Sequence, residues 1–264
     1  MLILKGLVIS ERDVGETGKA VTILTAELGC IDVYVRGGRK SKKSISSTQL
    51  FCYAEYSLES KTDAKNITHY YYNSSEPIRL FYDIRLDAKK TALACYFAEL
   101  LRFSCESAEN AGEILRLTLN TLHFLDKGER DMELLRSIFE LRLACETGYR
   151  PDLIGCHVCY TAEDELMYLN MRTGQLTCSG CAAKGEGAAS AVGVPELPGD
   201  DIYTAELDST MLYTIRFIAL VEYDRLFSFK LSQRYLVKLS AFTENYIRYQ
   251  FGKRFDTLRF YKLL

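Results

Sequence analysis

Four cysteines in two CxxC pairs are the residues whose type and spacing most directly imply chemistry. Cys156 and Cys159 form the first pair and Cys178 and Cys181 the second, giving the pattern C-x2-C-x18-C-x2-C. This spacing is typical of a four-thiolate zinc site. Four protein ligands leave no open position for a substrate, so we expect structural zinc. A redox-active or disulfide pair, and a site that has lost its metal, are the alternatives.

The sequence offers little for catalysis. Of the three histidines, His69 is expected in a strand, His123 in a helix, and His157 within the first CxxC pair, where solvent exposure is favoured over a fifth metal ligand. The segment 15–19 resembles a phosphate loop only superficially, because it lacks the four-residue spacing and the Gly-Lys-Ser/Thr ending. Neither HExxH nor GxSxG occurs. The chain is therefore expected not to be an enzyme.

Positive charge is segregated along the chain, although the net charge is only −2. No acidic residue occurs between Val33 and Ala54, and from Arg225 to the end nine basic residues stand against two acidic ones. Such segregation is what a polyanion-binding face needs. The predicted phosphate contacts are Arg36, Arg39, Lys40, Lys42 and Lys43. The alternative is that these five charges are merely solvated.

The elements that must position these groups begin with short β-strands. Residues 30–36 alternate, with Ile31, Val33 and Val35 on one face and Tyr34 on the other, as in a half-buried strand. Apolar or β-rich runs at 2–10, 21–25, 51–59 and 67–73 complete a set typical of a small barrel such as the OB-fold. Tyr34 on the outer face is then placed to stack a base of a single strand.

Helical periodicity follows the β-strands. Apolar residues recur at helical spacing in 93–101, 114–124, 134–145, 211–222 and 236–246. Gly148 and Gly252 are expected helix ends. Between the CxxC pairs, residues 166–169 and the turn after them predict a β-hairpin.

The expected fold class is α+β, with several domains. These are an OB-fold DNA-binding domain at 1–78, a helical domain beginning at 79–151, a zinc-binding module at 152–190, and a connector with C-terminal helices at 191–264 that completes the helical domain. We expect the later helices to dock on the earlier ones, because they are too few to form a core of their own.

Composition is that of a globular chain, with 48% hydrophobic and 26% charged residues. No apolar run approaches 18 residues and the N-terminus lacks a signal-peptide core, which favours a cytoplasmic location without a membrane partner. The remaining cysteines lie singly in apolar segments and are expected to be reduced. They are Cys30, Cys52, Cys95, Cys105 and Cys145.

Several motifs occur together in the order seen in one bacterial family. Residues 14–22 followed by 36–40 resemble the N-terminal signature of the RecO family of recombination mediators. Residues 139–143 and 148–151 are similar to the helix that leads into the family's zinc module, and 251–260 to its closing element. The two CxxC pairs match its metal ligands.

The resemblance implies an N-terminal OB-fold, a helical bundle and an inserted zinc module. It also implies binding of single- and double-stranded DNA, annealing of complementary strands, binding of the acidic C-terminal tail of single-stranded DNA-binding protein, and cooperation with RecR in loading RecA at gaps, all on the nucleoid. The matching basic positions are Arg36, Arg39 and Lys40. For the acidic-tail pocket the family's basic position is occupied by Ser137, so Arg136 and Arg142 are the candidate partner-binding residues.

Two other functional classes remain open from the residues alone. One is a zinc-stabilised protein-interaction scaffold whose basic loop is incidental. The other is a metalloenzyme, which would lose activity on chelation while keeping its fold. A four-thiolate site predicts loss of folding instead.

Overall fold

The computed structural model describes residues 1–16, 18–36, 46–105, 109–185 and 204–264. The chain forms two compact units. The first comprises residues 1–130 and 255–264, and the second comprises residues 131–254. The chain therefore leaves the first unit after Arg130 and returns to it for its last ten residues.

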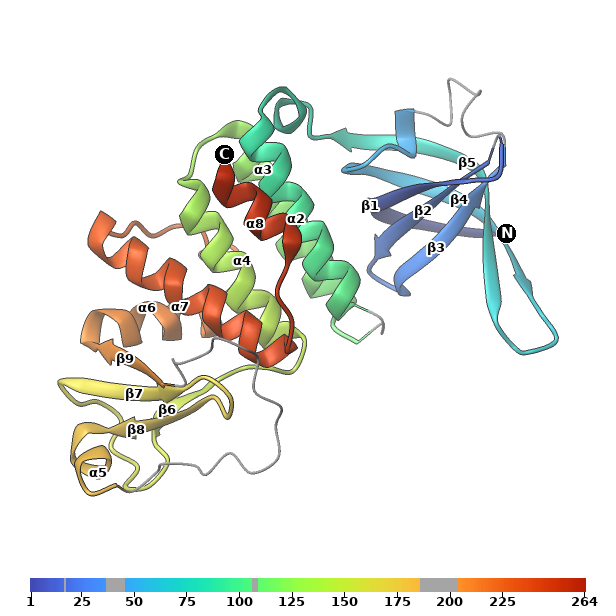
Figure 1. Ribbon diagram of the computed structural model, residues 1–264. Helices are drawn as coiled ribbons and strands as arrows, with labels where there is room; N and C mark the ends of the chain where they lie inside the picture. Colours follow the sequence, from blue (N-terminus) through green and yellow to red (C-terminus); the bar gives the residue numbers. More distant parts are fainter. Residues whose placement is uncertain (17, 37–45, 106–108, 186–203) are drawn as a thin grey trace. The chain divides into compact units, whose positions relative to one another are not determined.

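Five strands of the first unit close into a barrel (Figure 1). They are β1 (Leu2–Val14), β2 (Gly18–Thr25), β3 (Gly29–Val35), β4 (Cys52–Thr62) and β5 (Thr68–Leu80). Their order is β1-β2-β3-β5-β4, with β3 and β5 parallel and the other pairs antiparallel. A closed five-stranded barrel of this kind confirms the predicted OB-fold.

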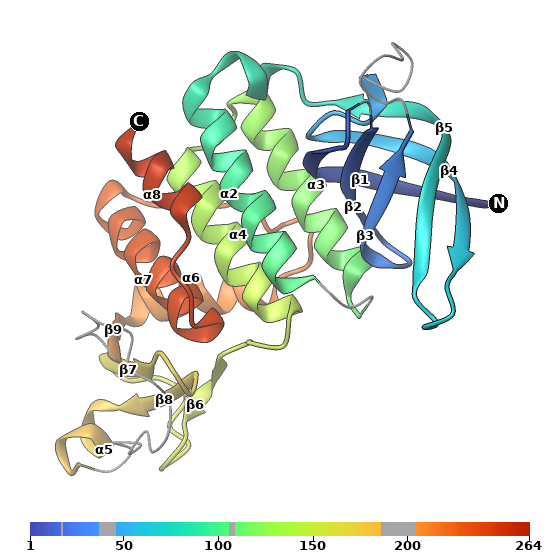
Figure 2. The same ribbon diagram turned by 45° about the vertical axis from the view of Figure 1, so that its right-hand side comes forward.

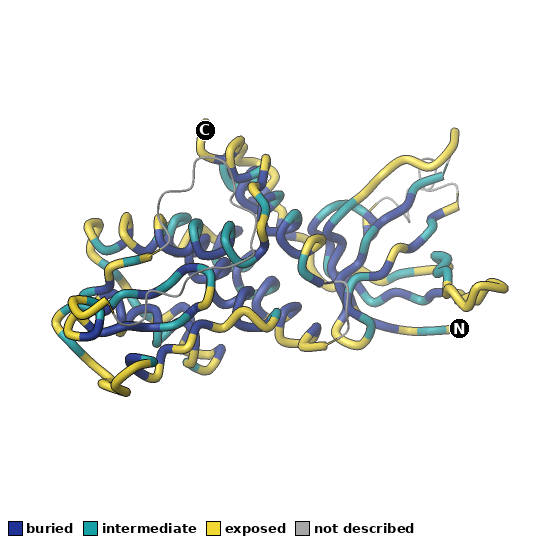
Figure 3. Tube along the Cα trace, turned by 60° about the horizontal axis from the view of Figure 1, so that its bottom comes forward, coloured by how far each residue is buried: buried dark blue, intermediate teal, exposed yellow. Residues whose placement is uncertain are grey.

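The barrel interior follows from the alternation of side chains along the strands. In β3, Ile31, Val33 and Val35 are buried while Tyr34 lies on the outer face, which confirms the predicted alternation. Figure 3 shows the same alternation of buried and less buried residues along the trace. Gly6 lies where β1 meets β2, and a Cβ there would come within 2.4 Å of the Ile23 side chain. A larger residue at position 6 would force the two strands apart.

The strand β5 runs further than its apolar pattern indicates, to Leu80 instead of residue 73. It crosses Pro77, which cannot donate a ladder hydrogen bond. The register shifts between Tyr53 and Ala54 opposite this segment, and such an irregularity is where a strand tolerates proline. Local composition therefore understated the length of the strand.

The first unit also contains a short 3-10 helix and three α-helices. They are η1 (Asp83–Leu86), α2 (Ala88–Ser104), α3 (Ala111–Lys127) and α8 (Asp256–Leu263). The Asp87 carboxylate caps α2 by accepting from the backbone N–H of Lys89 and Lys90. Helix α8 packs along α2, with the Phe255 ring edge-on to Tyr96 and Phe103 (Figure 1). Helical periodicity did not reveal α8, because it is only eight residues long.

The second unit is built on the helices α4 (Met132–Glu146), α6 (Ser209–Leu220) and α7 (Gln233–Phe251). Helix α4 packs on α7 and on α6, as expected for C-terminal helices that dock on an earlier one. Gly252 ends α7 in the left-handed conformation, as predicted. For α4 the cap is Thr147, one residue before the predicted Gly148, which itself has φ +92°.

A four-stranded sheet completes the second unit (Figure 2). Its strands are β6 (Asp152–Cys156), β7 (Leu166–Asn170), β8 (Gln175–Cys178) and β9 (Thr204–Asp208), in the order β6-β8-β7-β9, and the short helix α5 (Ser179–Ala183) follows β8. The antiparallel pairing of β7 with β8 confirms the predicted hairpin. Strand β9 was not predicted, since it joins the sheet from beyond the connector. Within the described ranges, no helix has the length and apolarity required to cross a membrane.

Candidate nucleic-acid interface and metal centre

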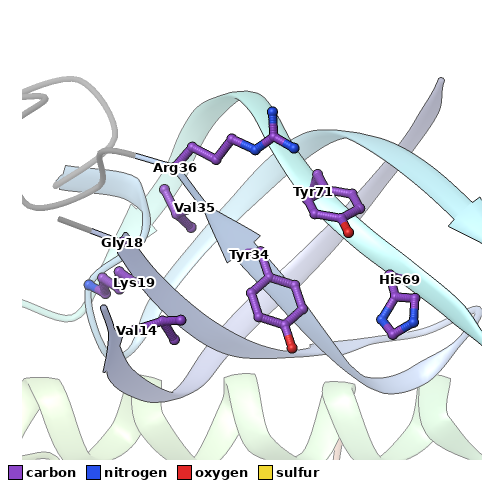
Figure 4. A pocket seen from close by; sticks show the side chains of 8 residues that line it. All are labelled: Val14, Gly18, Lys19, Tyr34, Val35, Arg36, His69 and Tyr71. Carbon is purple, nitrogen blue, oxygen red and sulfur yellow. The ribbon is translucent and has the colours of Figure 1, made fainter. Parts of the chain in front are cut away.

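A cavity of about 380 Å³ lies on the barrel where β1 ends and β2 and β5 begin (Figure 4). Its lining residues come from β1, β2, β3 and β5 and from the residue that follows β3. They are Val14, Gly18, Lys19, Tyr34, Val35, Arg36, His69 and Tyr71. The surface formed by β2 and β3 is where OB-folds bind oligonucleotides.

Two tyrosines form the aromatic part of the cavity. Tyr34 of β3 and Tyr71 of β5 are neighbours because the two strands pair in parallel at these residues. Their ring centroids are 5.9 Å apart and their planes are inclined by 32°. The Arg36 guanidinium lies 5.3 Å from the Tyr71 centroid and the Lys61 ammonium 5.6 Å from it. Aromatic faces beside cations are the combination on which single-stranded nucleic acids stack.

The other polar groups of the cavity are held by neighbours. The Lys19 ammonium lies 2.5 Å from Glu11 Oε2 and donates to the Thr48 carbonyl oxygen at 2.7 Å. These contacts neutralise Lys19 and fix the start of β2, so we assign it no phosphate contact. His69 Nε2 lies 3.2 Å from a carboxylate oxygen of Asp63. Hydrogen bonds from the backbone N–H of Ile67 and from His69 lower the pKa of Asp63, which keeps that carboxylate charged.

The predicted DNA-binding residues divide into two groups. Tyr34 and Arg36 lie in the cavity, as described above. Arg39, Lys40, Lys42 and Lys43 lie outside the described residues.

Sequence reasoning missed Tyr71, His69 and Lys61. The available signal was the alternation within β5, where Tyr70 and Tyr72 pack against the barrel core and Tyr71 between them points outward.

The four cysteines of the CxxC pairs converge at one point of the second unit. All four Sγ atoms lie within 4.8 Å of one another, and those of Cys159 and Cys178 are 3.6 Å apart. Tetrahedral zinc with ligands at about 2.3 Å would separate its sulfurs by about 3.8 Å, whereas a disulfide bond is only about 2.05 Å long. The thiols are free and their arrangement fits a metal ion. Hydrogen bonds with the side chain and backbone of Thr161, together with those with the Cys178 and Cys181 thiols, lower the pKa of Cys159 to about 6 and favour its thiolate. Burial and the neighbouring thiols raise the pKa of Cys181.

Local backbone geometry shapes the first CxxC pair. Tyr160 adopts φ +63°, and the Cys156 N–H donates to the Thr161 carbonyl oxygen at 2.9 Å, which closes the turn. The backbone N–H of His157 donates to the Leu176 carbonyl oxygen, and its Nδ1 lies 2.9 Å from the same oxygen. His157 is therefore half-buried against β8, which corrects the expected solvent exposure.

Arg216 of α6 holds this turn from outside. Its Nε donates to the Leu153 carbonyl oxygen at 2.9 Å and its Nη2 to the Ala162 carbonyl oxygen at 2.6 Å. The two carbonyls belong to the chain on either side of the first CxxC pair. Groups that orient ligands in this way tune metal affinity although they do not touch the metal.

The two arginines predicted to bind partners are buried in the second unit. Arg136 is 1% exposed, with Nη1 2.8 Å from a carboxylate oxygen of Glu140 and Nη2 2.7 Å from one of Glu133. Arg142 donates to the Ala219 carbonyl oxygen at 3.0 Å. Both guanidinium groups are engaged inside the unit, so their placement favours a structural role over contact with a partner.

Comparison with known proteins places these features in one family. The family model described as Recombination protein O N terminal matches residues 1–79, and the one described as Recombination protein O C terminal matches residues 85–193. The DNA repair protein RecO of Acetivibrio thermocellus is 27% identical over 260 residues, covering 98% of this chain and 95% of that protein. The DNA repair protein RecO of Dehalococcoides mccartyi strain CBDB1 is 32% identical over 180 residues, covering 67% of this chain and 68% of its own length.

The barrel, the helices and the four-cysteine cluster define the class as a multidomain OB-fold protein with a cluster of thiols that could hold a metal ion. The chain belongs to the RecO family of DNA repair proteins. The family resemblance inferred from the sequence motifs is thereby confirmed.

Proposed function

We propose that the protein is a recombination mediator that holds single-stranded DNA on the tyrosine face of its barrel, defined by Tyr34, Arg36, Lys61 and Tyr71. In this role it also binds double-stranded DNA, anneals complementary strands, and helps to load RecA at gaps covered by single-stranded DNA-binding protein. Its protein partners would be RecR and the acidic tail of single-stranded DNA-binding protein. In the cell the protein would act at the nucleoid.

The observation that carries the proposal is the adjacency of two aromatic rings and two cations. Bases of a single strand present free π-faces, whereas those of a duplex are stacked on one another, so an aromatic pair favours the single strand. The cations at Arg36 and Lys61 lie within cation–π distance of Tyr71 and can also meet the adjacent phosphates. The basic segment that follows Arg36 adds further charge of the same sign.

Annealing follows from how such a face holds a strand. Stacking engages the faces of the bases and leaves their Watson–Crick edges free, so a bound strand stays competent to pair. Cations that neutralise its phosphates also reduce repulsion of an incoming complementary strand. No bond is made or broken by the protein, and pairing itself supplies the driving force.

The cysteine cluster supports this role structurally. Cys156, Cys159, Cys178 and Cys181 would hold zinc, which supplies folding free energy to the module through four metal–thiolate bonds. The closed coordination leaves the DNA contacts to the barrel.

The test is a titration of fluorescently labelled single-stranded DNA at low and moderate salt, with metal content measured on the same sample. The variant Arg36→Ala/Arg39→Ala/Lys40→Ala should bind more weakly and with a flatter salt dependence, the slope falling by about 0.7 for each phosphate that is no longer neutralised. The control Lys5→Ala/Lys127→Ala/Lys184→Ala removes the same charge from exposed positions outside the cavity. Equal binding by the two triple variants would reject the site. Absence of binding by the unaltered protein at low salt would favour the scaffold alternative.

A further inference from the structure

Two cysteines outside the metal cluster lie against each other in the first unit. Cys30 stands near the start of β3, and Cys105 follows the last residue of α2. The backbone N–H of Cys30 donates to the Cys105 carbonyl oxygen at 3.3 Å, and the two thiols lie near enough to shift each other's pKa. The pair therefore joins the barrel to the end of a helix.

Both backbones are fixed around the pair. Cys105 caps α2, with its N–H donating to the Leu101 carbonyl oxygen at 2.9 Å, and its own carbonyl belongs to a helix end that needs an outside donor. On the other side, Gly29 has φ +67° and its carbonyl oxygen accepts from the Thr25 hydroxyl at 3.0 Å. Since both main chains are held, the two cysteines stay neighbours in the folded state.

The environment of the pair makes its two members chemically unequal. Interaction between the two thiols lowers the pKa of Cys105 and raises the pKa of Cys30, which burial raises further. Cys30 is half-buried and Cys105 is buried, so the pair is open to solvent on the Cys30 side.

We propose that Cys30 and Cys105 form a reversible disulfide when the protein encounters a peroxide. The Cys105 thiolate attacks one peroxide oxygen, the O–O bond breaks, and the departing oxygen takes up a proton to leave as water, which gives a sulfenic acid on Cys105. The Cys30 sulfur then attacks the Cys105 sulfur. The S–S bond forms, the S–O bond breaks, and the Cys30 proton leaves with the hydroxide as a second water. Two thiols are oxidised and one hydrogen peroxide is reduced to two waters.

The bond would tie β3 to the end of α2. Strand β3 carries Tyr34 and leads directly into Arg36. A disulfide at Cys30 would therefore link the strand of the tyrosine face covalently to the end of α2 in the same unit. Reversible disulfides of this kind in reducing compartments usually act as redox sensors. The inference rests on the thiol pair alone and does not depend on the proposed DNA binding.

The experiment treats the metal-loaded full chain with hydrogen peroxide, blocks the remaining thiols by alkylation, and maps the protease peptides by mass spectrometry. We expect a cross-linked peptide pair containing Cys30 and Cys105 that disappears on reduction with dithiothreitol. Cys95→Ser should retain the cross-link, since Cys95 lies on α2 away from the pair. Cys30→Ser should lose it and leave a Cys105 sulfenic acid that dimedone captures.

Two results would overturn the proposal. One is full alkylation of both Cys30 and Cys105 after peroxide treatment of the unaltered protein. The other is a cross-link from either cysteine to a different thiol in place of the expected one. Because the readout is the set of peptides from the unaltered chain, the result holds even where a serine variant fails to fold.

Discussion

Tyr71 is a candidate functional side chain only because residues far away in the sequence lie beside it in the fold. By itself it is one of three consecutive tyrosines in β5, two of which pack against the barrel core. Pairing with β3 places it next to Tyr34 and under the Arg36 guanidinium. The residue types were visible in the sequence, but the pairing that makes them a stacking surface was not.

Arg136 illustrates the opposite case, in which a residue predicted to bind a partner is buried in an ion-pair network. It lies between Glu133 and Glu140, and the Glu140 carboxylate is itself fully buried and bonded to the Thr243 hydroxyl at 2.5 Å. A charge in such a place is tolerated because its partner and hydrogen bonds replace water. The helical spacing of apolar residues along α4 does not predict that its polar residues are buried as well.

Removal of the Arg136 charge should therefore be costly. In Arg136→Met the Glu140 carboxylate stays buried without its guanidinium, so the free energy of unfolding should fall by about 3–5 kcal/mol. The control Arg12→Met breaks the exposed pair with Asp32, in which the side chains are 59% and 49% exposed, and should cost at most about 1 kcal/mol. Urea unfolding followed by circular dichroism measures both. A loss for Arg136→Met no larger than that of the control would show that the network is not stabilising.

At the scale of elements, α6 depends on the residue that begins it. Asp208 accepts from the Met211 N–H at 2.9 Å as the N-cap, and its other oxygen lies 2.9 Å from the Lys238 ammonium of α7. Burial opposes the charged form, but the contacts with Lys238 and Met211 outweigh it and lower the pKa of Asp208. A lowered pKa means that this carboxylate stabilises the fold above the ordinary aspartate pKa of about 3.9 and ceases to do so as pH falls through the lower value.

Two substitutions separate the cap from the charge. At pH 7, Asp208→Ala should be less stable than Asp208→Asn by about 1 kcal/mol, because asparagine still caps a helix and alanine does not. Below about pH 4 both variants should lose less stability than the unaltered protein, because neither carries the titrating carboxylate. Urea titrations at both pH values measure this. Equal acid sensitivity in all three proteins would exclude Asp208 as a source of the pH dependence.

If the four-cysteine cluster holds zinc as proposed, the stability of this part of the second unit should depend on the metal. A chelator that removes the metal should increase hydrogen exchange across residues 152–183, since the four thiolates bring together β6, β8 and α5. DNA binding by the barrel should survive, because its contacts lie in the other unit. The same exchange pattern with and without metal would contradict the structural role. Loss of an enzymatic activity with the exchange pattern unchanged would favour the metalloenzyme alternative.

At the scale of the whole molecule, local patterns predicted local structure well. The CxxC spacing, the alternation in β3 and the Gly252 helix end depend on neighbours in sequence, and the structure contains each of them. Features that join distant segments were missed, namely β9 in the four-stranded sheet and α8 on the first unit. Both elements pack against segments that are far away in the sequence. Hydrophobic periodicity describes local structure and carries no information about such contacts.

The division into two units places the cysteine cluster and the tyrosine face in different parts of the chain. The cluster lies within residues 131–254, and the tyrosine face within residues 1–130. The two CxxC pairs are the strongest motif in the sequence. The proposed DNA contact is nevertheless assigned to the barrel, where aromatic rings and cations meet.

The affinity of Tyr71→Ala for labelled single-stranded DNA tests this assignment most directly. Loss of one base–aromatic stack should weaken binding by about 1–3 kcal/mol, with little change in salt dependence because every cation that meets a phosphate is kept. The control Tyr82→Ala removes a tyrosine of the same unit that is 63% exposed and does not line the cavity, and it should bind like the unaltered protein. Equal affinities for Tyr71→Ala, Tyr82→Ala and the unaltered protein would contradict the assignment of DNA binding to the tyrosine face.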